Sequence, residues 1–235
     1  MIKFAEVNPL SNIDIKKIKE EISQTINKGD FILGSSVKRF EKKFSSISKT
    51  KYSVGCASGT DALILALMSL NLKSTDEVIV PGMTYISTGL SVILNKNKLI
   101  LADIDNETGL VSINDIKRKI TKKTKAVIPV NLYGQRVNIK KLRKTIGKKI
   151  FIIEDSAQSH FAYDNDNKKI FLNTFSDVSC YSFYPAKNLG AYGDAGLVST
   201  NNKTIYKKLL ALRNLGSIEK NKHYIIGLNS RLDTK

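Results

Sequence analysis

Hydrophobic and polar residues alternate along the chain with two different periods. A period near 3.6 residues, which gathers apolar side chains on one face of a helix, runs through 13–27, 37–47 and 61–70. Short apolar runs bounded by polar or turn residues predict strands. These strands are expected at 77–80, 99–102, 126–130, 151–153, 178–183 and 196–200. Because the two kinds of segment alternate, the pattern predicts an α/β fold with a largely parallel sheet.

The length and composition fit one globular unit. A chain of 235 residues is long enough for one full α/β domain and short for two. No apolar run approaches the ~20 residues that a membrane-spanning helix needs. The first residues, MIKFAEVNPLSNIDIKKIKEE, lack the apolar region and the cleavage site of a signal peptide. We therefore expect a cytoplasmic protein without a membrane anchor.

The net charge of +17 raises the question of a nucleic-acid partner. Lysines recur along the chain, mostly on predicted helices whose other face is apolar, and this is the pattern of a solvated surface. We therefore expect no nucleic-acid partner, although the charge would favour anionic substrates. Cys56 and Cys180 lie far apart, and His160 and His223 are isolated, so no metal site is expected.

The segment CASGTD at 56–61 leads into a predicted helix. Its backbone N–H groups and the Thr60 hydroxyl could bind an anion such as a phosphate at the helix N-terminus. Ser58 or Thr60 could equally serve only as the helix cap. From this segment alone, both interpretations remain open.

The segment IIEDSAQ at 152–158 places acidic residues directly after a buried strand. Asp155 could pair with a protonated ring nitrogen of a cofactor and hold the ring cationic. The competing interpretation, slightly favoured from this segment alone, is a helix cap after a strand-to-helix loop.

The segment 181–196 carries one lysine, Lys187, among small and aromatic residues. Such surroundings lower the pKa of an amine by desolvation, as a Schiff-base nucleophile requires, whereas an ordinary surface lysine would extend into water. Glycines at 190, 193 and 196 resemble a dinucleotide-binding loop superficially. That loop leads into a helix, however, and here a predicted strand follows, so the dinucleotide interpretation is rejected.

Eight motifs in order carry a resemblance over nearly the whole chain. They are SGTDAL at 58–63, PGMTYISTGLSVI at 81–93, DID at 103–105, VNLYGQ at 130–135, IIEDSAQSH at 152–160, YSFYPAKNLGAYGDAG at 181–196, LRNLG at 212–216 and IGLNSRLD at 226–233. Together they closely resemble the DegT/DnrJ/EryC1/StrS family of sugar aminotransferases, which depend on pyridoxal 5′-phosphate (PLP). The resemblance implies the large domain of PLP-dependent transferase fold type I, with a mostly parallel, seven-stranded mixed sheet between helices.

The resemblance also implies roles for individual residues. Lys187 looks like the lysine that joins PLP as a Schiff base and then carries protons. Asp155 is similar to the partner of the pyridinium nitrogen, Gln158 to the residue near the phenolic oxygen, and Tyr85 to the ring that stacks on the cofactor. The groups that match the phosphate site are Gly59, Thr60 and Ser182, and Asn229 resembles a residue that reaches the cofactor of a neighbouring subunit, which implies a homodimer.

The implied reaction is amination of a nucleotide-linked keto-sugar for polysaccharide biosynthesis, with an amino acid, commonly glutamate, as donor. Related sugar dehydratases have His where this chain has Lys187, so the lysine favours transamination. IIEDSAQSH departs from the usual pattern at Ser156 and Phe161, where Ala or Gly is more common.

Family members usually continue for another hundred or more residues. We therefore expect residues 1–235 to form the PLP-binding large domain, with a helical segment at about 1–50 and the small C-terminal domain absent. Two alternatives follow: a truncated, non-catalytic remnant or partial subunit that keeps only PLP binding or dimerisation, and a basic nucleic-acid-binding module.

Overall fold

The computed structural model of the chain describes residues 12–162, 175–219 and 221–234. Residues 1–11, on which the interpretation of the N-terminus rests, lie outside this range. Seven strands form the main sheet. They are β1 (Tyr52–Cys56), β2 (Glu77–Pro81), β3 (Lys98–Ala102), β4 (Thr124–Val127), β5 (Phe151–Asp155), β6 (Val178–Ser182) and β7 (Gly196–Thr200).

The order of the strands in the sheet is β1-β7-β6-β5-β4-β2-β3. Only β7 runs antiparallel to its neighbours, β6 and β1, while the pairs from β6 across to β3 are parallel. The predicted α/β class and the mostly parallel, seven-stranded mixed sheet are confirmed. Because six strands point the same way, their carboxyl ends meet at one edge of the sheet, which is where ligands bind in such folds.

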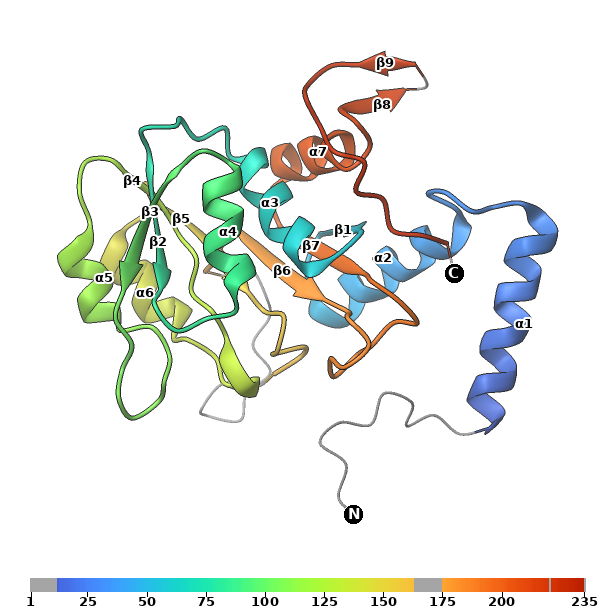
Figure 1. Cartoon of the computed structure of the whole chain (residues 1–235), viewed down its shortest axis with the longest axis horizontal. Helices are drawn as coiled ribbons and strands as arrows, with labels where there is room; N and C mark the ends of the chain where they lie inside the picture. The colour runs from blue at the N-terminus through green and yellow to red at the C-terminus, as the bar shows by residue number, and fades with distance from the viewer. Residues whose placement is uncertain (1–11, 163–174, 220, 235) are drawn as a thin grey trace.

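Eight helical segments accompany the sheet in the described residues. They are α1 (Asn12–Lys28), α2 (Ser35–Ser48), α3 (Gly59–Ser69), α4 (Ile86–Leu94), α5 (Ile113–Lys119), the 3-10 turn η1 (Leu132–Gly134), α6 (Ile139–Ile146) and α7 (Lys203–Leu212). A small hairpin of β8 (Ser217–Glu219) and β9 (Lys222–His223) follows α7. Helix α1 projects away from the sheet and buries none of its described side chains (Figure 1).

Side chains on successive strand positions pack on opposite faces of the sheet, as the pleat requires. On β5, Ile153 joins the hydrophobic core under α3, α4 and α7, while Ile152 joins the core under α5 and α6. Phe44 of α2 packs with Tyr181 in a third cluster at the β6–β7 side. The sheet therefore lies between two helical layers (Figure 1).

The sequence pattern located six of the seven strands and missed β1. The β1 sequence, YSVGC, contains a glycine and two residues with hydroxyl groups, so it lacks the continuous apolar run of the other strands. Its pairing with β7, which joins Tyr52 to Thr200 and Cys56 to Gly196, creates the strand. The expected strand at 126–130 is shifted toward the N-terminus, since β4 is Thr124–Val127. Beyond β4, Val130 forms an isolated β-bridge to Asp155.

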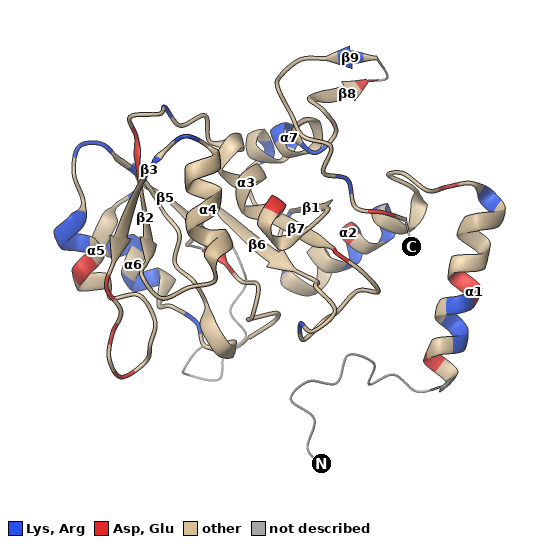
Figure 2. Cartoon of the chain, in the orientation of Figure 1, with Lys and Arg blue, Asp and Glu red and all other residues tan. Residues whose placement is uncertain are grey.

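The positive charge is concentrated in one stretch of the chain, contrary to the expected even distribution of lysines. Residues 117–149 contain thirteen of the lysines and arginines and no Asp or Glu. Many of these cations lie on and around α5 and α6 (Figure 2). Within the described residues, no helix is both long and apolar enough to cross a bilayer, and no group of three or more His, Cys, Asp or Glu side chains could hold a metal.

Candidate active site

A cavity of about 560 Å³ opens at the carboxyl ends of the parallel strands. The residues that line it come from the start of α3, the start of α4, the end of β5, the end of β6 and the loop 183–195. It brings together seven of the eight predicted site residues, which are Gly59, Thr60, Tyr85, Asp155, Gln158, Ser182 and Lys187. Asn229 does not line this cavity and is exposed on the segment that pairs with Asn214.

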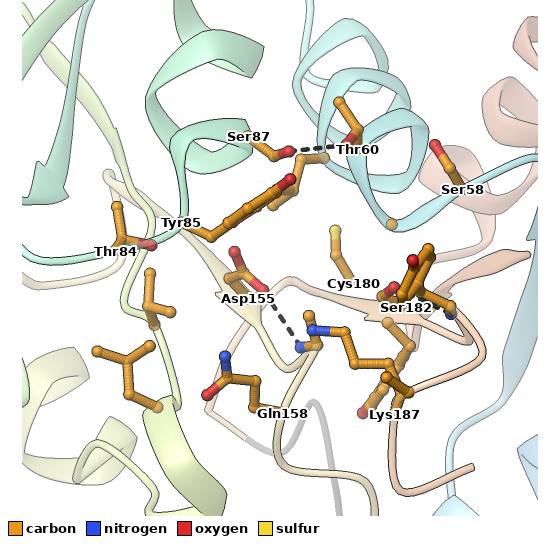
Figure 3. Close-up of a pocket in the computed structure, with 18 of the residues that line it drawn as sticks. Ser58, Thr60, Thr84, Tyr85, Ser87, Asp155, Gln158, Cys180, Ser182 and Lys187 are labelled. Atoms are coloured by element: carbon orange, nitrogen blue, oxygen red, sulfur yellow. Dashed lines mark hydrogen bonds between the residues drawn. The ribbon is translucent and has the colours of Figure 1, made fainter. Parts of the chain in front are cut away.

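The start of α3 forms one end of the cavity. Ser58 is the helix cap, because its hydroxyl oxygen accepts a hydrogen bond from the Asp61 N–H at 3.1 Å. The Thr60 hydroxyl instead pairs with Ser87 Oγ of α4 at 2.8 Å (Figure 3). Ser182 closes this end from β6, and a Cβ at Gly59 would lie 2.5 Å from the Ser182 Cβ. Hydroxyl groups and a helix N-terminus that meet at such close range suit a phosphate.

We predict that Gly196→Ala damages this end of the cavity. A Cβ at Gly196 would overlap the carbonyl oxygen of Ser58, which is backbone and cannot rotate away. The substitution should therefore displace the α3 N-terminus from β7 and destabilise the fold by roughly 1–3 kcal/mol. Urea unfolding measures the loss. Gly82→Ala is the matched control, because its Cβ would meet its nearest neighbour at 3.6 Å, and equal stability of the two variants would contradict the prediction.

Asp155 ends β5 and is buried, with 6% of its surface exposed. One carboxylate oxygen, Oδ2, accepts a hydrogen bond from Thr88 Oγ1 at 2.9 Å, and Oδ1 accepts one from the Ala157 N–H at 3.2 Å. Burial raises the pKa of Asp155, while these bonds and the charge of Lys187 act to lower it. No helix follows Asp155 in the described residues, so the helix-cap interpretation is wrong.

Lys187 and Gln158 extend into the same part of the cavity (Figure 3). The Lys187 side chain is half-buried and points across the cavity toward Asp155, so it is not an ordinary surface lysine. The Gln158 oxygen, Oε1, accepts the backbone N–H of Tyr133 at 2.8 Å. Because this bond fixes which end of the amide is the acceptor, the Gln158 NH₂ group is left as a donor for a ligand.

Tyr85 precedes α4 and lines the cavity, yet 72% of its surface is exposed. An aromatic ring at the wall of a cavity offers a broad apolar face that a flat ligand can cover. The predicted stacking role of Tyr85 remains a prediction, and its position is compatible with it.

His160 contacts the backbone of Ser182, one of the residues that line the cavity. Its Nε2 lies 2.8 Å from the Ser182 carbonyl oxygen, which can only accept, so Nε2 carries the proton. Burial lowers the pKa of His160 to about 4. The folded chain therefore keeps this ring neutral at pH 6, where much of the unfolded chain would carry it protonated.

This shift predicts acid sensitivity. Between pH 6.5 and pH 4 the unfolded state binds more protons at His160 than the folded state, so stability is complete above pH 6.5 and falls as the pH falls. The loss should reach about 2 kcal/mol at pH 5. Urea unfolding at pH 7 and pH 5, compared between the native chain and His160→Gln, isolates this contribution. An identical loss in both chains would rule out His160 as its source.

Sequence reasoning missed three hydroxyl groups at the start of α4. Thr84 and Ser87 line the cavity, and Thr88 holds Asp155. The motif PGMTYISTG contains all three at a close spacing, with Thr84 just before the N-cap Tyr85 and with Ser87 and Thr88 in the first turn of α4. That spacing was the available signal.

The sheet order and the cavity define the class of this protein as a transferase of fold type I. The chain belongs to the DegT/DnrJ/EryC1/StrS aminotransferase family, whose model matches residues 12–234.

Curated relatives share much of the sequence. The chain is 39% identical to a UDP-N-acetyl-3-dehydro-α-D-glucosamine 3-aminotransferase of Acidithiobacillus ferrooxidans, over 90% of this chain and 57% of that protein. It is 36% identical to the UDP-2-acetamido-2-deoxy-3-oxo-D-glucuronate aminotransferase of Pseudomonas aeruginosa, over 100% of this chain and 65% of that protein. The chain thus spans about three fifths of the length of these relatives.

A solved structure has the same fold. DesV of S. venezuelae, crystallised with a ketimine intermediate, matches with a TM-score of 0.91 and 33% identity, over 99% of this chain and 62% of that one. NtdA of Bacillus subtilis, crystallised with its cofactor PMP, also reaches 0.91, with 30% identity over 99% of this chain and 53% of that one.

Proposed function

We propose that this protein holds PLP and transfers an amino group from an amino acid, glutamate in the first instance, to a ketone carbon of a nucleotide-linked sugar. One observation carries the proposal. An amine, Lys187, and a buried carboxylate, Asp155, face the same cavity, with a phosphate cradle, the hydroxyl and N–H groups at the start of α3 and at Ser182, at one end of it.

The residues present fit the cofactor. Gly59, Thr60 and Ser182 would hold its phosphate, and the absence of a Cβ at Gly59 lets these groups approach one another closely. The Asp155 carboxylate would accept the pyridinium N–H, while the Gln158 NH₂ group would donate to the phenolic oxygen. Tyr85 would cover one face of the ring. When bound, PLP supplies an electron sink for the bond changes at carbon.

The chain itself supplies binding, orientation and proton movement. Lys187 can attach the cofactor through its amine and, once released, accept and donate a proton at the substrate carbon. Asp155 would stabilise positive charge on the ring, because the Asp155 side chain is buried and largely shielded from water. The names of the relatives support a nucleotide-linked keto-sugar as the amine acceptor.

The position of Asn229 supports a homodimer as part of the proposal. This side chain is exposed and outside the cavity of its own chain, as a residue that serves a second subunit would be. An apolar surface on α4 and the edge strand β3 is also exposed, and a subunit contact would bury it. Its residues include Ile86, Ile93, Leu94 and Leu101, which are 69%, 58%, 56% and 53% exposed.

The reaction can be tested directly. The purified chain is titrated with PLP, and the bound form is mixed with glutamate and with a UDP-linked or dTDP-linked 3-keto-sugar, while 2-oxoglutarate and the amino-sugar are measured. Formation of both products supports the full proposal. Saturable PLP binding without either product would instead favour the non-catalytic alternative, and no PLP binding would contradict the proposed function.

A second measurement tests the dimer. Sedimentation velocity of the PLP-loaded chain should show two copies, and Asn229→Ala should weaken PLP binding severalfold while the sedimentation coefficient stays the same. A monomer that binds PLP with the native affinity would contradict the dimer proposal.

A further inference from the structure

Asp155 receives its only side-chain hydrogen bond within the described residues from a residue that lies outside the cavity lining. Thr88 is in the first turn of α4, has no exposed surface, and donates from Oγ1 to Asp155 Oδ2 at 2.9 Å. The neighbouring Thr84 Oγ1 lies 2.8 Å from Thr88 Oγ1. A row of two hydroxyl groups thus connects the cavity wall to the buried carboxylate.

The direction of this row follows from proton counting. An ionised carboxylate can only accept, so the single O–H proton of Thr88 points to Asp155. The proton between the two threonines must then come from Thr84. Both hydroxyl groups therefore donate toward Asp155, and the row would have to reverse if Asp155 carried a proton on Oδ2.

The hydrogen bond from Thr88 matters because Asp155 is buried without an ion-pair partner among the described residues. Glu154 and Asp155 are consecutive strand residues and face opposite sides of the sheet. Glu154 is paired with Arg136 on the α6 side, whereas no described cation forms an ion pair with Asp155. Burial alone would favour the neutral acid, so hydrogen bonds to the charged form have to offset it.

We propose that Thr88, supported by Thr84, is a positioning residue that keeps Asp155 ionised and fixes its carboxylate plane. The inference rests on the proposed function, since it makes Asp155 ready to accept a pyridinium N–H before the cofactor arrives. Thr88 does not line the cavity, so it would act on a ligand only through Asp155.

The ionisation of Asp155 can be measured without any cofactor. Carbon-13 NMR of chain labelled at the Asp side-chain carbonyl, with the signal assigned through Asp155→Asn, gives the pKa of this group. Thr88→Val keeps the shape of the side chain and removes the donor, and we expect it to raise the pKa of Asp155 by about one unit or more. Thr88→Ser should restore the native value, and Thr84→Val should produce a smaller rise.

A change of charge on a neighbouring group would also affect the titration of Asp155. Lys187 approaches Asp155 from the loop 183–195 and Cys180 approaches it from β6, while His160, on the segment after β5, lies close enough to Lys187 to feel its charge. Burial keeps the pKa of Cys180 well above its ordinary value and that of His160 at about 4, so neither should change charge between pH 5 and pH 8.

Thr200→Val is the matched control. Thr200 is also fully buried, and its hydroxyl donates to the Asp177 carbonyl oxygen and accepts from the Asn202 N–H, but it lies at the far end of β7 from the cavity. We expect Thr88→Val to weaken PLP binding at least about tenfold, and Thr200→Val to leave it unchanged. A native Asp155 titration in Thr88→Val would overturn the inference. If the native chain fails to bind PLP, the proposed function fails, and the NMR titration still decides the role of Thr88.

Discussion

Lys187→Ala should abolish covalent attachment of PLP and reduce the amination rate by about 10³-fold or more. If the proposed function is right, the variant loses both the amine that would attach the cofactor and the base that would move the proton at the substrate carbon. The fold should persist, because Lys187 is half-buried on a loop and its side chain extends into the cavity. Borohydride reduction followed by peptide mass spectrometry measures attachment, and 2-oxoglutarate release measures the rate.

Lys187→Arg separates the effect of the positive charge from the effect of the nucleophilic amine. Arginine keeps a cation opposite Asp155, but it stays protonated and cannot attack the cofactor. Its attachment should therefore be lost as completely as in Lys187→Ala, although noncovalent PLP binding should be better preserved. Reduction that labels another lysine in the native chain would show that the cavity is not the cofactor site.

Arg136→Met should strongly destabilise the fold, because Arg136 forms a buried ion pair in the loop before α6. Arg136 donates to Glu154 at 2.9 Å, and the two side chains are 4% and 2% exposed. Removing the cation leaves a buried carboxylate whose remaining donors are Asn131, Ser176 and Ser179, which are all neutral. The expected loss is about 3–5 kcal/mol of unfolding free energy, measured in urea.

Two comparisons make this prediction specific. Arg39→Ala breaks an ion pair with Glu21 in which both side chains are more than 60% exposed, so its cost should be below about 1 kcal/mol. The double variant Arg136→Met with Glu154→Leu removes both charges and should recover much of the lost stability. If the double variant is less stable than Arg136→Met, the destabilisation does not come from an uncompensated charge.

The sequence pattern predicted the regular part of the fold because buried parallel strands are apolar over their whole length. Ile152 and Ile153 are both buried, on opposite faces, and so give a continuous run that is easy to recognise. β1 has no such run, and its position at the edge of the sheet depends on β7, far away in the sequence. A pairing partner at that distance leaves no local signal in the chain.

The residues of the candidate site also differ in whether the local sequence predicts their role. Lys187, Asp155 and Gln158 stand in motifs whose residue types suggest chemistry, and the cavity brings them together. The bond from Thr88 to Asp155 joins residues 67 positions apart, and that from Arg136 to Glu154 also crosses between elements. Threonine in a helix and arginine in a loop are ordinary in isolation, so their roles emerge only from the three-dimensional arrangement.

The antiparallel strand β7 has a consequence for the order in which the site can form during folding. β6 and β7 pair as a hairpin around the loop that carries Lys187, so these two strands can pair after only a short loop has closed. β1, which leads to the phosphate cradle, can join only by pairing across 140 residues or more. Loop closure at that distance is slow. The loop that carries Lys187 would thus form early, and the phosphate-binding groups would be completed in the last step of folding. Binding of a phosphorylated ligand would therefore report that folding is complete.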